Sequence, residues 1–224
     1  MKIKLLLVNK KYRNNITEAV NEMLTDFPIL NNLNIVIHMR KLDRRLGNSF
    51  ASHRNIYSRK RIIHEIKLNP KAFFFPGIEK KLESVMDANY ATVKDIIWHE
   101  LGHVLQIYML MDDRGIEPDK FRYTPQTYYE IFENNEMNAR CFCQHMQQQL
   151  STCRWNKGKA EKLLGGYAVH NPYEFIPECF NNYYRLRNIG ILDDYEQETF
   201  QFVKMVVDDY KNIIEKVTRS RFKK

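Results

Sequence analysis

The sequence predicts an α+β fold, in which β-strands occupy the first part of the chain and α-helices the second. Short segments with alternating apolar and polar residues occur only before residue 90, and longer helical patterns follow. The 224 residues are 44% hydrophobic and include 13 Phe, 13 Tyr and 2 Trp, enough for a sizeable core. We expect one domain over residues 1–224, with a strand-rich part (1–90) and a helical part (91–224).

The strand-rich part contains four segments that read as strands. Residues 2–8 form a short apolar run, and residues 34–42 alternate through Ile35, Ile37 and Met39. A polar link joins residues 49–57 to Arg61–Leu68, whose alternation ends at an Asn-Pro pair. Helices are expected over residues 16–27, where apolar side chains share one face, and over residues 78–86.

The helical part begins with a recognisable start signal. Thr92 suits the N-cap, because Asp95 three residues later completes a pattern close to a capping box. Further helices are expected over residues 124–153, 171–188 and 194–217, and residues 157–167 read as a short helix or a loop.

Composition narrows the classes of function. The net charge is +8, but Lys and Arg are spread along the chain without a recognition motif, so specific nucleic-acid binding is not expected. No apolar run reaches the roughly 20 residues of a bilayer-spanning helix, so no membrane span is expected. Oligomeric state cannot be read from the sequence.

The start of the chain and its cysteines indicate the compartment of synthesis. The apolar stretch Leu5–Val8 is too short for a signal-peptide core, and four cysteines in helix-like sequence are typical of free thiols in a reducing interior. We expect cytoplasmic synthesis. The protein could reach its place of action by packaging in a particle or by export along a non-classical route.

A metal-binding pattern lies in residues 96–105. His99 and His103 are four apart, so on a helix both imidazoles project from the same face, where one Zn²⁺ can take both. Glu100 lies between them and can accept a proton from a water molecule at the metal. The motif predicts a zinc site with Glu100 as general base.

Two glutamates compete for the place of third ligand. Glu174 lies 71 residues after His103 and Glu136 lies 33 after it. Each also has an explanation without a metal. Glu174 could complete a capping box at the start of a helix near Pro172, and Glu136 could be a solvent-facing residue of its helix. The residues by themselves leave both possible.

A resemblance bears on this choice. The stretch from Tyr167 to Glu178 resembles the ligand segment of the anthrax-lethal-factor-like zinc peptidases, which are gluzincins with a zincin-like fold. In that family a tyrosine is followed after seven residues by the ligand glutamate and after four more by a second glutamate. Tyr167, Glu174 and Glu178 stand at those spacings, and Pro177 stands where the family usually has a small residue.

The resemblance, which covers roughly residues 60–185, implies a set of roles. His99, His103 and Glu174 would hold one catalytic zinc, Glu100 would be the general base, and Tyr167 would donate a hydrogen bond to the developing oxyanion. Glu178 could accept a hydrogen bond from the other nitrogen of a ligand histidine.

The sequence thus predicts a zincin-like zinc endopeptidase that cleaves a protein or peptide substrate. We expect Arg61–Leu68 to be an edge strand beside the metal helix, able to pair with an extended peptide. The alternatives are a catalytically silent zincin fold used for interaction, and a structural protein associated with nucleic acid or a virion.

Overall fold

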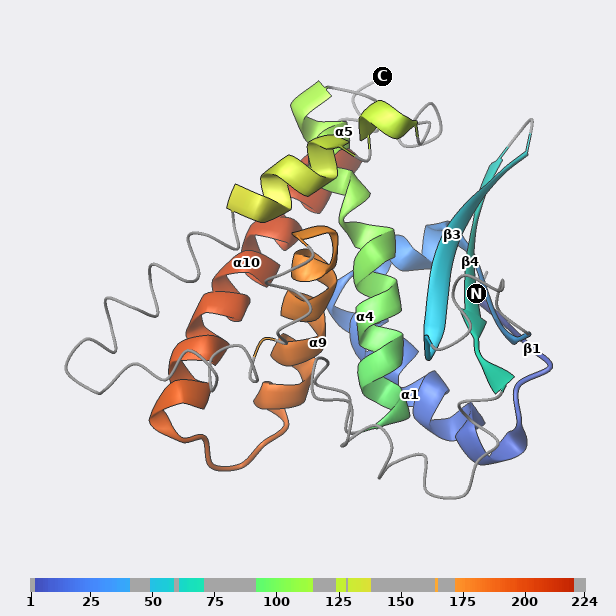
Figure 1. The fold of residues 1–224 in the computed structure, drawn as a ribbon, viewed down its shortest axis with the longest axis horizontal. Helices are drawn as coiled ribbons and strands as arrows, with labels where there is room; N and C mark the ends of the chain where they lie inside the picture. The colour runs from blue at the N-terminus through green and yellow to red at the C-terminus, as the bar shows by residue number, and fades with distance from the viewer. Residues whose placement is uncertain are drawn as a thin grey trace.

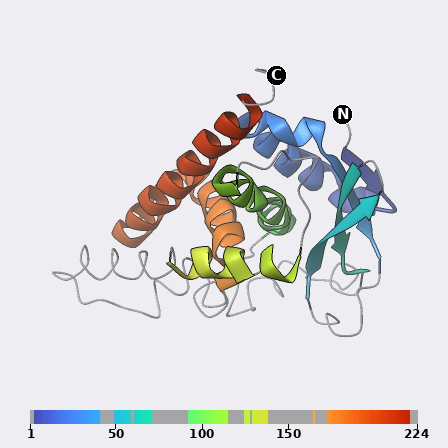
Figure 2. The same ribbon diagram turned by 90° about the horizontal axis from the view of Figure 1, so that it is seen from above.

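The computed structural model describes residues 3–40, 49–58, 61–70, 92–114, 124–127, 129–137, 164 and 172–219. These residues form a mixed α+β structure with one small sheet, as the sequence predicts. The sheet lies to one side, a central helix stands next to it, and further helices pack beyond that helix (Figures 1 and 2).

Four strands build the sheet, and each overlaps a predicted strand. They are β1 (Ile3–Leu6), β2 (Asn34–Met39), β3 (Ala51–Ser58) and β4 (Arg61–Leu68). Their order across the sheet is β1-β2-β4-β3. β2 pairs in parallel with β1 and β4, whereas β3 pairs antiparallel with β4.

The prediction that Arg61–Leu68 is an edge strand is wrong. β4 lies inside the sheet, between β2 and β3, and β3 occupies the edge. Ser58 pairs with Arg61, so only two residues connect the strands. A connection that short forces an antiparallel hairpin. β3 must therefore cover the side of β4 that β2 leaves open.

One face of the sheet supplies part of the core and also carries polar groups. Ile35, Ile37 and Ile66 are fully buried on this face. The register places Asn55 of β3 opposite His64 of β4, and Ile66 opposite His53. Side chains directly opposite each other share a face. This face is therefore apolar at β2 and becomes polar at β3, where His53 and Asn55 lie.

Helix α1 (Lys10–Asp26) begins six residues before the predicted start at residue 16. The side chain of Asn9 accepts a hydrogen bond from the backbone N–H of Lys11 at 3.0 Å and caps the helix. Its first turns are largely polar, and of their residues Tyr12 is buried. Apolar periodicity therefore misses the first turns. After α1, Pro28–Asn32 forms the short 3₁₀ helix η1.

The central helix α4 (Val93–Leu105) begins as predicted. The backbone N–H of Thr92 donates to Asp95 Oδ2 at 2.6 Å, and the two residues form a capping box. α4 is buried on nearly every side and packs against α1, β3 and α9 (Phe175–Arg187). The polar side chains of His99, Glu100 and His103 are therefore buried together with its apolar residues.

The remaining described helices follow the prediction in outline, except that no separate helix was predicted at residues 107–114. They are α5 (Ile107–Arg114), the 3₁₀ turn η3 (Pro172–Glu174), α9 and α10 (Asp194–Arg219). Residues 125–127 and 129–137 are helical within the predicted segment 124–153, and Leu164 is helical within 157–167. The predicted helix at 78–86 and the rest of those two segments lie outside the described residues. None of the described helices has both the length and the apolar character that crossing a bilayer requires.

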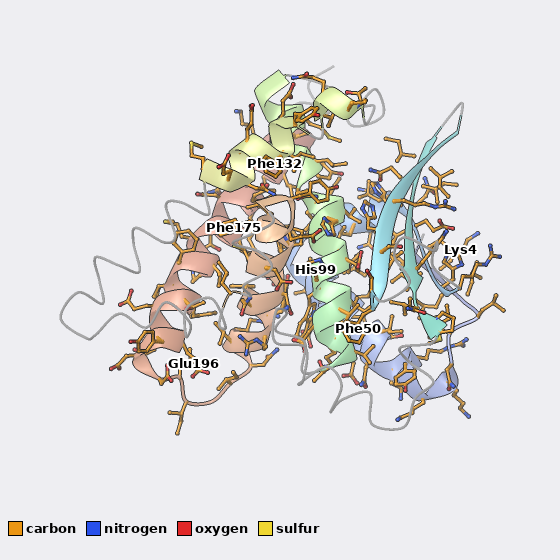
Figure 3. All side chains as sticks on the ribbon, in the orientation of Figure 1. Lys4, Phe50, His99, Phe132, Phe175 and Glu196 are labelled. Atoms are coloured by element: carbon orange, nitrogen blue, oxygen red, sulfur yellow. The ribbon has the colours of Figure 1, made fainter. Side chains whose placement is uncertain are left out.

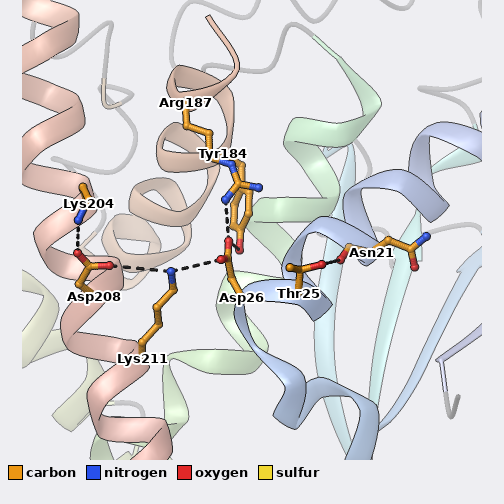
Figure 4. A network of polar contacts seen from close by, with 8 residues as sticks. All are labelled: Asn21, Thr25, Asp26, Tyr184, Arg187, Lys204, Asp208 and Lys211. Carbon is orange, nitrogen blue, oxygen red and sulfur yellow. Dashed lines mark hydrogen bonds and ion pairs between the residues drawn. The ribbon is translucent and has the colours of Figure 1, made fainter.

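A polar network at the end of α1 joins three helices (Figure 4). Asp26 at the end of α1 accepts hydrogen bonds from the Tyr184 hydroxyl (2.9 Å) and Arg187 (2.7 Å) of α9, and from Lys211 of α10 (3.3 Å). Burial alone would raise the pKa of Asp26, but these hydrogen bonds and charges hold it below its ordinary value. The first helix is thus tied to the last two.

Candidate metal centre

The centre is built on α4, which carries both motif histidines. His99 and His103 are 5% and 6% exposed, and their rings lie edge to face with centroids 4.9 Å apart. Figure 3 shows His99 midway along α4, between the sheet and the helices beyond it. The spacing of four places the two imidazoles one turn apart on one face, as predicted.

Glu174 reaches both histidines from η3. Its Oε2 atom lies 3.0 Å from Nε2 of His99 and 3.0 Å from Nε2 of His103. Among the described residues these three form a group of nitrogen and oxygen donors within 4.8 Å of one another. In a tetrahedral zinc site with metal–ligand distances of about 2.0–2.1 Å, neighbouring donor atoms are about 3.3 Å apart. The three donors could therefore hold a metal ion, and the two printed 3.0 Å separations are close to that spacing.

The close approach of α9 to α4 depends on Gly102. A Cβ atom on Gly102 would lie 2.8 Å from Cα of Pro177 and 3.3 Å from Cδ2 of Phe180. Pro177 is the third residue of α9, where a backbone N–H has no partner within the helix in any case. The proline at this position therefore costs the helix no internal hydrogen bond, and its backbone packs directly on the glycine.

Glu178 stands at the other side of His99, one turn after Glu174. Its Oε1 atom lies 3.0 Å from Nδ1 of His99, and the residue is fully buried. Asn181 donates to the second carboxylate oxygen at 3.2 Å. Burial alone would lower the pKa of His99, but Glu178 and Glu174 at its two ring nitrogens raise it well above the ordinary value.

Glu174 is shifted in the opposite sense. Burial would raise the pKa of its carboxyl, yet His103 and His99 hold it well below the usual range. The carboxylate is therefore charged where it meets the two imidazoles. Charged oxygen and imidazole nitrogen are both ligands that zinc accepts.

Glu100 is buried beside this group, and because it is adjacent to His99 on the helix its side chain leaves the axis about 100° away from that of His99. It is 5% exposed, and its Oε2 atom has no hydrogen-bond partner among the described residues. Burial raises the pKa of its carboxyl, and the charges of His103 and His99 oppose the rise. A buried acceptor with a raised pKa next to two histidines is suited to take up a proton there.

The structure separates the two candidates for third ligand. Glu136 is half-buried and belongs to no three-donor cluster among the described residues, whereas its neighbour Asn135 is fully buried. Adjacent helical residues point about 100° apart, so the two side chains face different ways. Tyr167, the predicted oxyanion donor, lies outside the described residues.

Sequence reasoning missed several residues around His103, of which Gln106 and Asn135 are buried and Tyr173 and His53 are half-buried. The rings of Tyr173 and of His53 on β3 stack on His103, at centroid distances of 5.2 and 6.0 Å. The side-chain amide of Gln106 contacts Nδ1 of His103 at 2.9 Å, and Asn135 lies behind Gln106. Gln106 stands three residues after His103. This helical spacing is the one sequence feature that could have indicated their contact.

His53 and His64 of the sheet are neutral neighbours of the centre. Their rings stack at 5.7 Å. Burial lowers the pKa of His64 to about 4, and burial together with His64 and His103 lowers that of His53 well below its ordinary value. β3 therefore presents an uncharged imidazole beside His103.

No protein-family model matches the chain, and comparison with curated proteins and with solved structures finds no match.

Proposed function

We propose that the chain is a zinc-dependent endopeptidase with a zincin-like arrangement. The observation that carries the proposal is the meeting of His99, His103 and Glu174, in which one carboxylate oxygen lies 3.0 Å from both Nε2 atoms. Three protein ligands that leave a further position open are typical of catalytic zinc, whereas structural zinc is usually closed by four. The resemblance in the Tyr167–Glu178 segment points the same way.

Each residue of the centre has a role in this proposal. His99, His103 and Glu174 hold the ion, and Glu178 accepts a hydrogen bond from Nδ1 of His99 and thereby fixes its tautomer. Zinc, when bound, acidifies water and polarises the scissile carbonyl group. The protein supplies the geometry and the proton transfers.

Glu100 moves the proton during hydrolysis. Its carboxylate accepts a proton from the attacking water as the water oxygen bonds to the carbonyl carbon. It then delivers that proton to the amide nitrogen as the C–N bond breaks, which gives a carboxylic acid and an amine. In this scheme Tyr167 keeps its predicted role as a donor to the oxyanion.

The substrate class follows from the sheet edge. β3, and not β4, is the strand at the edge beside α4, and its His53 stacks on His103. An extended peptide that pairs with an edge strand offers its main chain at regular spacing, while side-chain sites select the sequence. A protein segment in extended form is the substrate that fits this arrangement.

The first experiment measures zinc by elemental analysis in the purified protein and in Glu174→Ala and Glu136→Ala. We expect about one zinc per wild-type chain, a loss with Glu174→Ala and no loss with the matched Glu136→Ala. Loss with Glu136→Ala alone would overturn the ligand assignment. A wild type that takes up no zinc after reconstitution would overturn the proposal.

Activity is tested with a peptide library derived from cell proteins and read by mass spectrometry. We expect cleavage by the wild type and none by Glu100→Gln, although that variant still binds zinc, because the amide cannot accept the proton. Zinc binding without cleavage in the wild type would favour the catalytically silent alternative, in which the centre serves an interaction.

A further inference from the structure

We propose that His53 and Asn55 of β3 form a subsite that selects substrate side chains carrying an uncharged amide or hydroxyl group. The inference rests on the peptidase proposed above and names the kind of sequence that it takes. It follows from where an added strand places its side chains and from the hydrogen-bonding groups that β3 presents there.

The two faces of β3 offer different side chains to a neighbouring strand. β3 is the edge strand next to α4 (Figure 1). His53 stacks on His103 of α4, so it lies on the face of the sheet that carries the metal centre. Successive side chains of a strand point to opposite faces, so Asn55 shares this face and Arg54 lies on the other. A peptide that pairs with β3 places every second side chain on the face of His53 and Asn55, with opposite Cβ atoms about 4.5–5.5 Å apart.

The subsite holds hydrogen-bonding groups that the described protein does not use. Nε2 of His53 and Oδ1 of Asn55 are buried atoms, and neither has a hydrogen-bond partner among the described residues. The same holds for Nδ1 of His64, which pairs with Asn55 across the two strands and stacks on His53. Polar atoms left unpaired out of water are costly. A substrate side chain beside His53 and Asn55 can supply the partners.

The chemistry of these two groups decides which side chain fits. The Asn55 amide both donates and accepts, and the neutral imidazole of His53 has one donor and one acceptor. Amide and hydroxyl side chains also do both, so they find partners in either orientation. A carboxylate only accepts and an ammonium group only donates, and each would lose water without meeting an opposite charge in the subsite. An apolar side chain leaves both groups unpaired.

The spacing along β3 gives the preference a period. His53 and Asn55 are two residues apart, so the substrate residues opposite them are also two apart. The residue between these lies beside Arg54, whose guanidinium group is paired with Glu65. We therefore expect Asn, Gln, Ser or Thr at two substrate positions separated by one residue, and no such preference at the position between them.

The test measures binding, so it does not depend on cleavage. Zinc-loaded Glu100→Gln protein is immobilised and exposed to a degenerate library of synthetic peptides, and the retained peptides are sequenced by mass spectrometry. Pairs of amide or hydroxyl residues two apart should be enriched about 2–10-fold over pairs one or three apart, the effect of about one hydrogen bond. This comparison lies within one protein and needs no further variant.

Variants of β3 in the same protein assign the preference to its residues. Asn55→Leu, and His53→Phe, which keeps a ring beside His103, should each abolish the enrichment of spaced pairs. Ser52→Val on the other face of β3 is the matched control and should keep it. Chelator competition for zinc and the urea midpoint show whether each variant keeps the fold and the metal centre.

The outcomes separate this inference from the proposed function. If the wild type cleaves peptides but spaced pairs are not enriched, or if Asn55→Leu retains the same peptides as Ser52→Val, the subsite is overturned and the peptidase stands. If spaced pairs are enriched and the wild type cleaves nothing, the subsite stands as a peptide-binding surface and the peptidase falls. If no peptide is retained and none is cleaved, both fall.

Discussion

Gly102→Ala is the substitution that most directly probes how α9 is brought to the centre. The added Cβ would lie 2.8 Å from Cα of Pro177, a backbone atom that cannot turn away, and 3.3 Å from a ring atom of Phe180. Ordinary contact begins near 3.4 Å, so the two helices must separate by at least 3.4 − 2.8 = 0.6 Å. Glu174 and Glu178 lie three residues before and one residue after Pro177, so a shift of this backbone changes their contacts with His99.

The energetic effect is a balance of two terms. Overpacking in a close contact costs about 1–3 kcal/mol, whereas replacing glycine by alanine inside a helix gains about 1 kcal/mol. We therefore expect a net loss of about 0–2 kcal/mol, or a fall in Tm of about 0–8 °C for a chain of this size. Zinc affinity should fall more clearly than stability, because the ligand distances change directly.

Urea unfolding with and without zinc, together with chelator competition, measures both effects. Gly190→Ala is the matched control, since nothing lies within 4 Å of its added Cβ, and it should change neither quantity. If Gly102→Ala binds zinc as tightly as Gly190→Ala and is as stable, the close approach of α9 does not limit the site.

Three further predictions concern other contacts. Glu178→Met should weaken zinc binding by about 10–100-fold in chelator competition, because Nδ1 of His99 loses its acceptor; unchanged affinity would remove Glu178 from the centre. Thr92→Ala should lower the stability by about 1 kcal/mol through loss of the N-cap of α4, whereas the exposed Thr25→Ala should leave the urea midpoint nearly unchanged. Asp26→Asn should be less stable than the wild type at neutral pH. The pKa of this carboxyl is lowered from 3.8 in the folded protein, so its contribution is complete above the unfolded pKa and is lost as the pH falls through the folded pKa; a gap in urea midpoint that stays constant from pH 7 to about pH 2 would contradict this.

Local patterns predicted those features that local physics decides. Alternation located the strands, and the pair Thr92 and Asp95 located the start of α4, because a capping box is complete within four residues. The spacing of His99 and His103 predicted that both rings lie on one face, because residues four apart on a helix are one turn apart.

Features that depend on distant parts of the chain were not accessible in this way. Apolar periodicity cannot tell which strand covers which, so the edge position was assigned to the wrong member of the β3–β4 hairpin. Glu174 lies 71 residues from His103, and only a resemblance, and no local rule, favoured it over Glu136. Asn135 gave no signal at all, because its contacts with Gln106 and Tyr173 arise from packing.

The edge position of β3 also bears on self-association. Among the described strands, β3 pairs with β4 alone, and a strand with an unpaired side can accept the same side of a second copy as readily as another chain. Arg54, which projects from β3 and is paired with Glu65, places charge on this strand, a common means of discouraging such pairing. At high protein concentration, two copies joined edge to edge would hide the surface that an extended peptide needs. For the peptidase proposed above, the apparent activity per chain would then fall as the protein concentration rises.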